Sequence, residues 1–178
     1  MPMKGIKCGD IGPKLGYNSK DNGWLSFDQV RIPRAQMLMK YVSVDRQGVH
    51  RTHGDKRVLY SIMLSTRCLM VKGAGWDLLK GCLIGLRYSA VRRQFENVEK
   101  GRETKLLDYQ SQQLKIFPHF ATGISHMICY QLVDKMYKQL IEDCKVGKFD
   151  LLDLLHHYTS GFKAVFTEQC LNGLLVIR

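Results

Sequence analysis

The 178-residue sequence has no C-x-x-C pair, no apolar leader segment and too few acidic residues to balance its basic ones. Its six cysteines fit neither a zinc site nor a compact disulfide framework, so we expect free thiols in a reducing intracellular compartment. The first ten residues lack the apolar core of a secretory signal, and the final LLVIR is not an S-K-L address, so no targeting signal is expected. Arg67, Lys72 and Asp77 interrupt the longest candidate for a membrane span, and we expect none.

The charge balance is strongly basic. There are 27 Lys and Arg against 16 Asp and Glu, which gives a formal net charge of +11. Such a chain attracts polyanions, including nucleic acid, anionic lipid and phosphorylated cofactors. The basic residues are scattered over all segments and form no recognisable RNA-binding module, so we expect no specific nucleic-acid partner. A hydrophobic content of 45% argues against disorder.

Residues 1–55 have the patterns of strands and turns. Residues 24–32 alternate apolar and polar side chains, which predicts a strand, whereas the Gly, Asp and Asn of residues 7–23 favour turns. Residues 41–51 have the pattern of a hairpin that turns at residues 46–48. These strands are too few for a complete sheet, because an isolated two-stranded ribbon is marginal in water.

Residues 56–178 predict a bundle of long helices, over about residues 57–95, 104–145 and 151–177. The glycines at 73 and 75 indicate a kink or very close helix packing. Thr104 is the expected cap of the second helix, and Pro118 is expected to bend it. Since the helices are apolar on more than one face, the chain is expected to pack against further segments or a partner chain.

The segment RYSAVRRQF, residues 87–95, concentrates arginine and aromatic side chains at the end of an apolar run. The rigid fork of arginine suits a phosphate, a carboxylate or a stacked ring. On a continuous helix, Tyr88, Arg92 and Phe95 would lie on one side. The competing interpretations are an exposed Arg92–Glu96 pair and a core position for Phe95.

Two other patterns suggest sites and are rejected. His119 and His126 lie seven residues apart on one helical face, but two ligands do not make a metal site, and none is predicted. The glycines of GDIGPKLG lack the G-K-[ST] ending of a phosphate loop, so a turn is preferred.

Three stretches together resemble the acyl-CoA oxidases, flavoenzymes related to the acyl-CoA dehydrogenases. They are GDIGPKLGYNSKDNGWLSFDQVRIPRAQML, RYSAVRRQF and LLDYQSQQLKIFPHFA. The resemblance extends from Gly5 to about Lys163. It implies a mainly α fold: a long-helix bundle, incomplete at its C-terminus, preceded by a remnant of a β-barrel domain. It also implies FAD-dependent oxidation of fatty acyl-CoA to trans-2-enoyl-CoA in β-oxidation, with O2 reduced to H2O2.

The resemblance assigns roles to particular residues. Arg92 matches the family arginine that meets the FAD pyrophosphate, commonly from a neighbouring subunit, and Gln94 and Phe95 match adjacent cofactor contacts. Gln110 matches another position near the cofactor, and Arg67 matches an arginine lining the acyl-CoA cleft. Peroxisomal localisation and pairing in a homodimer, or with a second chain that supplies missing segments, are implied in the same way.

The resemblance also implies missing parts. The strands that hold the flavin ring and the family's glutamate base match no residue of this chain, and the base would lie beyond Arg178. The sequence therefore leaves two interpretations within the family: an oxidase chain that is inactive alone, as a fragment or a subunit completed by another chain, and a non-catalytic structural subunit. A third interpretation, a basic nucleic-acid-binding protein, rests on the net charge of +11 alone.

Overall fold

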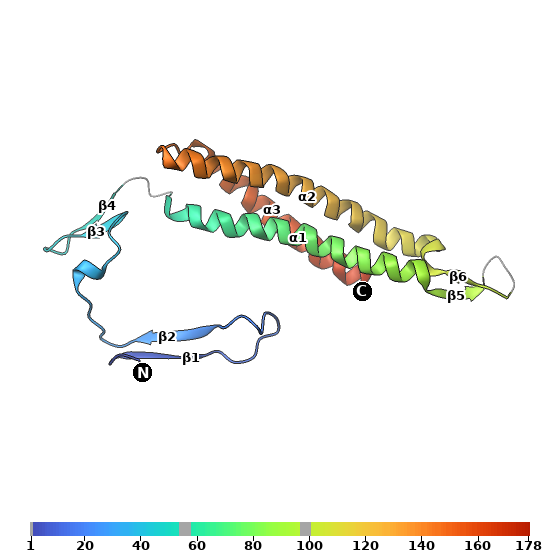
Figure 1. Ribbon diagram of the computed structural model, residues 1–178, viewed down its shortest axis with the longest axis horizontal. Helices are drawn as coiled ribbons and strands as arrows, with labels where there is room; N and C mark the ends of the chain where they lie inside the picture. Colours follow the sequence, from blue (N-terminus) through green and yellow to red (C-terminus); the bar gives the residue numbers. More distant parts are fainter. Residues whose placement is uncertain (1, 54–57, 97–100) are drawn as a thin grey trace. The chain divides into compact units, whose positions relative to one another are not determined.

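The computed structural model describes residues 2–53, 58–96 and 101–178, in two compact units, Met1–Lys56 and Arg57–Arg178 (Figure 1). The first unit contains short strands, and the second consists largely of three long helices. This composition confirms the predicted mainly α fold class. The boundary expected between residues 55 and 56 lies outside the described residues.

The first hairpin pairs β1 (Ile6–Asp10) with β2 (Gly23–Phe27) in antiparallel register. The strand predicted over residues 24–32 ends at Phe27, because Gln29 adopts a left-handed φ of 51° that no regular strand contains. Residues 7–10, predicted as turn, belong to β1. Their strand conformation depends on pairing with β2, since their own sequence lacks an apolar alternation.

The second hairpin, β3 (Val42–Val44) with β4 (His50–Thr52), confirms the predicted turn, and η1 (Arg34–Gln36) precedes it. Asp45 organises this turn, because its Oδ1 accepts hydrogen bonds from the backbone N–H groups of Gln47 at 2.9 Å and Val49 at 2.8 Å.

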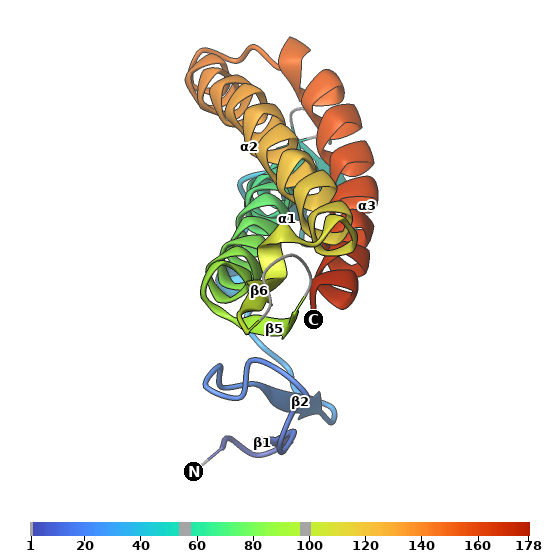
Figure 2. The same ribbon diagram turned by 90° about the vertical axis from the view of Figure 1, so that its right-hand side faces the viewer.

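Three helices lie side by side in the second unit: α1 (Val58–Val91), α2 (Gln110–Lys145) and α3 (Asp150–Ile177) (Figures 1 and 2). Each helix buries apolar side chains at helical spacing, and α1 packs against both of the others. The core forms two clusters along the bundle. One contains Val71, Ala74, Leu78, Cys82, Ile116, Phe166 and Cys170, and the other contains Leu64, Cys68, Val133, Leu140, Leu152 and Leu155.

Glycines let the helices approach closely. A Cβ atom added at Gly75 would lie 3.0 Å from the Cβ of His126, which confirms the close packing expected there, and α1 continues without interruption. At Gly123 on α2, an added Cβ would lie 2.8 Å from both Cγ and Cδ2 of Leu79. Gly73, by contrast, faces open space. Thus only some of the helical glycines are needed for packing.

His126 is a buried polar residue between the three helices. Its ring stacks on Phe166 with centroids 3.8 Å apart, and its Nε2 lies 2.8 Å from Oε1 of Gln169. Its Nδ1 is buried without a hydrogen-bond partner. Burial lowers the pKa of His126, and the hydrogen bond to Gln169 opposes that shift. The neutral ring, with Nε2 donating to Gln169, fits this environment.

Acidification is expected to destabilise the helical unit through His126. Since its pKa is lower in the folded than in the unfolded chain, its stabilising contribution is complete above pH 6.5, the ordinary value, and falls below it. The limiting slope for one proton is about 1.4 kcal/mol per pH unit. Urea unfolding of the wild type and His126→Gln between pH 7.5 and 5.5 measures this. Parallel pH profiles for the two proteins would contradict it.

Most thiols of the helical unit are buried. Burial raises the pKa of Cys68 to about 11, with the carboxylate of Asp134 contributing, and burial also raises the pKa values of Cys82 and Cys170. Cys8 on β1 is exposed. All six cysteines are free, as expected.

The segment between α1 and α2 departs from the prediction. The first helix was expected to reach Phe95 but ends at Val91, and residues 93–96 form β5 (Arg93–Glu96) paired with β6 (Glu103–Lys105). The helix has no packing reason to continue, since Val91 and Phe95 are exposed. Thr104 is not a helix cap: it lies in β6, followed by η2 (Leu106–Asp108), and α2 begins at Gln110.

Among the described residues, no helix is both long enough and apolar enough to cross a membrane. The same residues contain no group of three or more His, Cys, Asp or Glu side chains placed to hold a metal ion.

Candidate functional site

The residues predicted to contact a cofactor gather where α1 ends and α2 begins. Arg92 follows the last residue of α1, and its backbone is fixed on both sides. Its N–H donates to the carbonyl of Tyr88 at 2.9 Å, and its carbonyl accepts the N–H of Leu106 at 2.9 Å. The Arg92 side chain is exposed. The predicted helical placement of Arg92 and Phe95 is wrong, but the backbone still holds Arg92 at a defined position.

Phe95 lies in an irregular part of the β5–β6 ribbon. Its φ is 61°, and the strand register shifts between Arg93 and Glu96. A left-handed conformation is costly for a bulky residue, and such outliers concentrate at ligand contacts. The ring is 69% exposed, which excludes a core role in this structure. The ribbon therefore exposes an aromatic ring at its surface.

Tyr109 ties the ribbon to the start of α2. Its hydroxyl donates to the carbonyl of Gln94 at 2.8 Å. Beside this bond lies a hollow of about 190 Å³, lined by Gln94, Phe95, Leu106, Tyr109, Ser111 and Gln112. Two predicted contacts, Gln94 and Phe95, thus border one concave surface.

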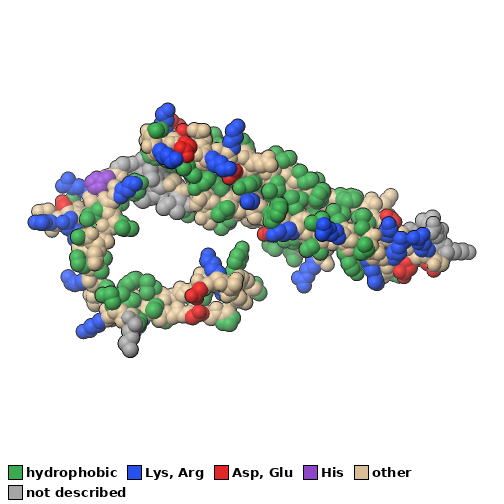
Figure 3. Space-filling view, viewed as in Figure 1, with side chains coloured by type: hydrophobic (Ala, Val, Ile, Leu, Met, Phe, Trp, Pro, Cys, Tyr) green, Lys and Arg blue, Asp and Glu red, His purple; other side chains and the backbone are tan. Residues whose placement is uncertain are grey.

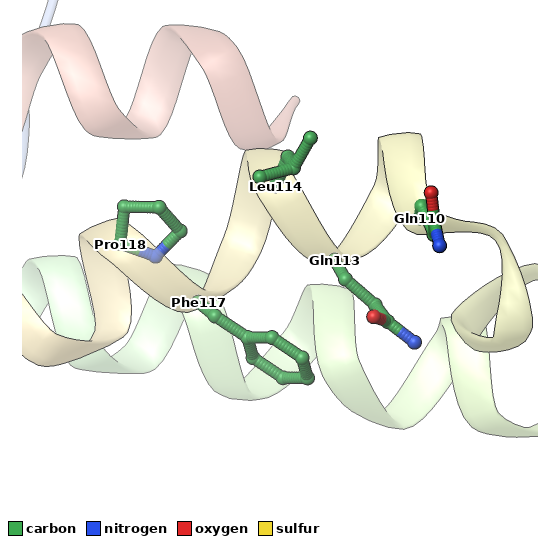
Figure 4. A pocket seen from close by; sticks show the side chains of 5 residues that line it. All are labelled: Gln110, Gln113, Leu114, Phe117 and Pro118. Carbon is green, nitrogen blue, oxygen red and sulfur yellow. The ribbon is translucent and has the colours of Figure 1, made fainter.

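Gln110 borders a second hollow, of about 390 Å³, together with Gln113, Leu114, Phe117 and Pro118. In Figure 4, Leu114 and Pro118 point to one side of α2, and Gln113 and Phe117 point to the other. The first turn of α2 is anchored by a hydrogen bond from Gln112 Nε2 to the hydroxyl of the buried Ser89, at 3.0 Å. This anchor fixes the helix start relative to α1.

Basic side chains lie close to Arg92 at this end of the bundle. The first turn of α2 contains no acidic residue, although Asp108 lies two residues before the helix begins. Arg92, Arg93 and Lys105 lie in the adjoining segment together with Glu96, Glu103 and Asp108, and Figure 3 shows Lys and Arg side chains at this end with Asp and Glu among them. One Arg93 nitrogen is occupied, because Nη1 donates to the carbonyl of Glu103 at 2.9 Å. Arg92 is the basic side chain nearest in sequence to the end of α1.

Arg67 lies far from this group. It is 24 residues before Val91 on α1, which corresponds to about 36 Å along the helix axis. Its Nη1 donates to Nδ1 of His156 at 3.0 Å and to Oγ of Ser160 at 3.1 Å, both on α3. Within one chain the structure therefore does not bring Arg67 together with Arg92, Gln94, Phe95 and Gln110.

Sequence reasoning missed three parts of this site. They are the strained backbone of Phe95, the bond from Tyr109 to Gln94 and the anchor between Gln112 and Ser89. The pattern of apolar residues does not indicate the left-handed backbone of Phe95. The run of glutamines after Tyr109 was the feature of the sequence from which the hydrogen bond between Gln112 and Ser89 could have been predicted.

Comparisons with known proteins agree on one family. Residues 60–178 match the model of the acyl-CoA oxidase C-alpha1 domain. Peroxisomal acyl-coenzyme A oxidase 1 of Mus musculus is 40% identical over 173 residues, 97% of this chain and 26% of the relative. The solved structure of Arabidopsis thaliana acyl-CoA oxidase 1 superposes with a TM-score of 0.88 at 37% identity, over 99% of this chain and 27% of that one.

A further solved structure contains ligands. It is acyl-CoA oxidase-2 of Caenorhabditis elegans bound with FAD, ascaroside-CoA and ATP, similar to this chain with a TM-score of 0.86 and 35% identity. The similarity covers 98% of this chain and 27% of that one. This chain spans about a quarter of the length of the relatives it matches.

Proposed function

This chain belongs to the acyl-CoA oxidase family, and from that premise we propose that it takes part in FAD-dependent oxidation of a fatty acyl-CoA to trans-2-enoyl-CoA, with O2 reduced to H2O2. When bound, FAD would supply the acceptor for the hydride that leaves the acyl chain. The chain's own contribution is to bind and orient the cofactor at the β5–β6 ribbon and the start of α2.

The observation that carries the proposal is the grouping of Arg92, Phe95 and Gln110 at one end of the bundle. Arg92 offers a fork of donors suited to diphosphate oxygens, beside a helix start without acidic residues. Phe95 offers an exposed ring, held by a left-handed backbone, to a flat heterocycle. Gln94 and Gln110 border the two hollows and would supply directional hydrogen bonds.

The base that removes the α proton of the thioester is not assigned to any carboxylate of this chain. We propose that this base and the strands around the flavin ring come from other segments, in a homodimer or from a second chain. On its own, the chain would bind FAD weakly and release no peroxide. Peroxisomal residence is proposed by relation to the mouse protein.

Flavin titration tests the proposal. We expect FAD to bind the purified chain with a dissociation constant below about 1 mM, and riboflavin, which lacks the diphosphate, to bind at least tenfold more weakly. Quenching of flavin fluorescence reports both affinities. Equal affinities, or no FAD binding up to about 1 mM, would contradict the assignment of the site. Peroxide release from palmitoyl-CoA by the chain alone would contradict the missing base.

A further inference from the structure

One peptide unit of the β5–β6 ribbon determines where the Phe95 ring lies. The carbonyl of Gln94 and the N–H of Phe95 belong to this planar unit, so its orientation sets the φ of Phe95, which is 61°. A bulky residue rarely adopts this left-handed conformation, because its Cβ crowds the backbone there. Such a conformation persists only where the surrounding structure holds it in place.

The strand pairing of the ribbon does not include this peptide unit. Arg93 pairs with Lys105 and Glu96 pairs with Glu103, so residues 94 and 95 fall in the register shift between the two pairs. The Gln94 carbonyl instead accepts a hydrogen bond from the side chain of Tyr109, whose hydroxyl lies 2.8 Å away. This hydrogen bond holds the carbonyl in the orientation that gives Phe95 its left-handed φ.

Tyr109 is itself fixed by the start of α2. Its backbone N–H donates to the carbonyl of Leu106 at 3.2 Å, and its carbonyl accepts the N–H groups of Gln112 at 3.0 Å and Gln113 at 3.1 Å. Its side chain is half-buried. The side chain of Gln112 in turn donates to the hydroxyl of Ser89 on α1. The position of the Tyr109 hydroxyl is therefore set by the helices, and the ribbon is held against them.

We propose that Tyr109 is a positioning residue for the cofactor site. Its hydroxyl holds the peptide unit between Gln94 and Phe95, so that Phe95 keeps the conformation in which its ring meets the flat heterocycle of FAD. The inference rests on the proposed function for the contact with FAD. The dependence of the Phe95 backbone on Tyr109, by contrast, is a property of the chain without its cofactor.

Loss of this hydrogen bond changes the surface that a ligand meets. Gln94, Phe95 and Tyr109 line the same hollow of about 190 Å³. Without the Tyr109 hydroxyl, the Gln94 carbonyl turns towards water and Phe95 relaxes towards the extended conformations that a bulky residue prefers. The ring then points in other directions, and FAD has to order it on binding. A site that is ordered beforehand binds more tightly, because this cost is avoided.

Tyr109→Phe removes the hydroxyl and keeps the ring, so it tests the hydrogen bond alone. We expect the affinity for FAD, measured by quenching of flavin fluorescence, to fall about two- to tenfold. Circular dichroism should show the helix content of the wild type, since Tyr109 lies outside the two core clusters. Tyr130→Phe is the matched control. It removes a hydroxyl that donates to Asp134 at 3.3 Å, about 30 Å further along α2, and should leave FAD binding unchanged.

A double-mutant cycle with Phe95→Ala shows whether Tyr109 acts through Phe95. Phe95→Ala removes the ring and should weaken FAD binding about tenfold. If Tyr109 acts by directing that ring, adding Tyr109→Phe to Phe95→Ala should change the dissociation constant by less than about twofold. Fully additive losses would overturn the inference, because a hydroxyl that only stabilises the ribbon, or that binds FAD itself, acts equally in both backgrounds.

NMR of the isotopically labelled 178-residue chain without FAD separates this inference from the proposed function. The coupling between the amide and α protons of Phe95, together with its Cα chemical shift, reports its φ. We expect both to change in Tyr109→Phe and to keep their wild-type values in Tyr130→Phe. Unchanged values in Tyr109→Phe would overturn the inference even if the wild type binds FAD. The expected change in a chain that binds no FAD would reject only the flavin site.

Discussion

Replacing Arg92 by alanine is expected to weaken FAD binding about 10- to 100-fold. A hydrogen bond between charged partners contributes about 1.5–3 kcal/mol, and the exposed guanidinium is not needed for the fold. Flavin fluorescence quenching, on wild type and variant side by side, gives the ratio of dissociation constants. The melting temperature should stay the same, since no core residue is touched.

Two further variants make this result specific. Arg92→Lys keeps the charge but loses the planar fork, so it should recover only part of the affinity. Lys163→Ala removes an exposed charge from α3 and should have no effect. If Arg92→Ala and Lys163→Ala bind FAD equally well, the ribbon end is not the diphosphate site.

Gly123→Val is expected to destabilise the helical unit by about 1–3 kcal/mol. An added Cβ at this position would lie 2.8 Å from Leu79 Cγ, and valine adds two further methyl groups in a space already filled. Leu79 or the separation of α1 and α2 would have to change, because the contact includes the branch carbon Cγ as well as the terminal Cδ2, with the Leu79 backbone nitrogen 3.5 Å away. Urea unfolding followed by circular dichroism measures the change in the free energy of unfolding.

Gly73→Ala is the matched control on the same bundle. This glycine is helical, but its Cβ position faces open space, so alanine should stabilise the unit by about 0.5–1 kcal/mol. Opposite signs for the two substitutions are the expected pattern. A stabilising effect of Gly123→Val would show that α1 and α2 do not pack as closely as described.

The three long helices could be predicted from the sequence because their apolar residues recur at intervals of three and four residues over many turns. The sequence did not predict the conformation of residues 92–96 and 101–105, which comes from pairing between β5 and β6 and from the backbone hydrogen bond between Arg92 and Leu106. Residues 7–10 were missed for the same reason, since β1 exists through its partner strand. Local patterns carry little information about such pairing.

The candidate site was only partly predictable. Arg92, Gln94, Phe95 and Gln110 were selected by resemblance to a family, and the structure brings them to one end of the bundle. The left-handed φ of Phe95 follows from the register shift in the ribbon, which no periodicity encodes. The separation of Arg67 from this group follows from the length of an uninterrupted α1, where Gly73 and Gly75 had indicated a kink or very close helix packing.

The burial of the thiols affects how fast the cysteines of this chain are oxidised by hydrogen peroxide. Peroxide attacks the thiolate form of cysteine, and a pKa of about 11 leaves Cys68 almost wholly protonated at neutral pH. Cys82 and Cys170 are shielded in the same way, inside the packed helices. These three buried thiols are therefore expected to react slowly with added hydrogen peroxide, and sulfenic acid is expected first at the exposed Cys8 on β1.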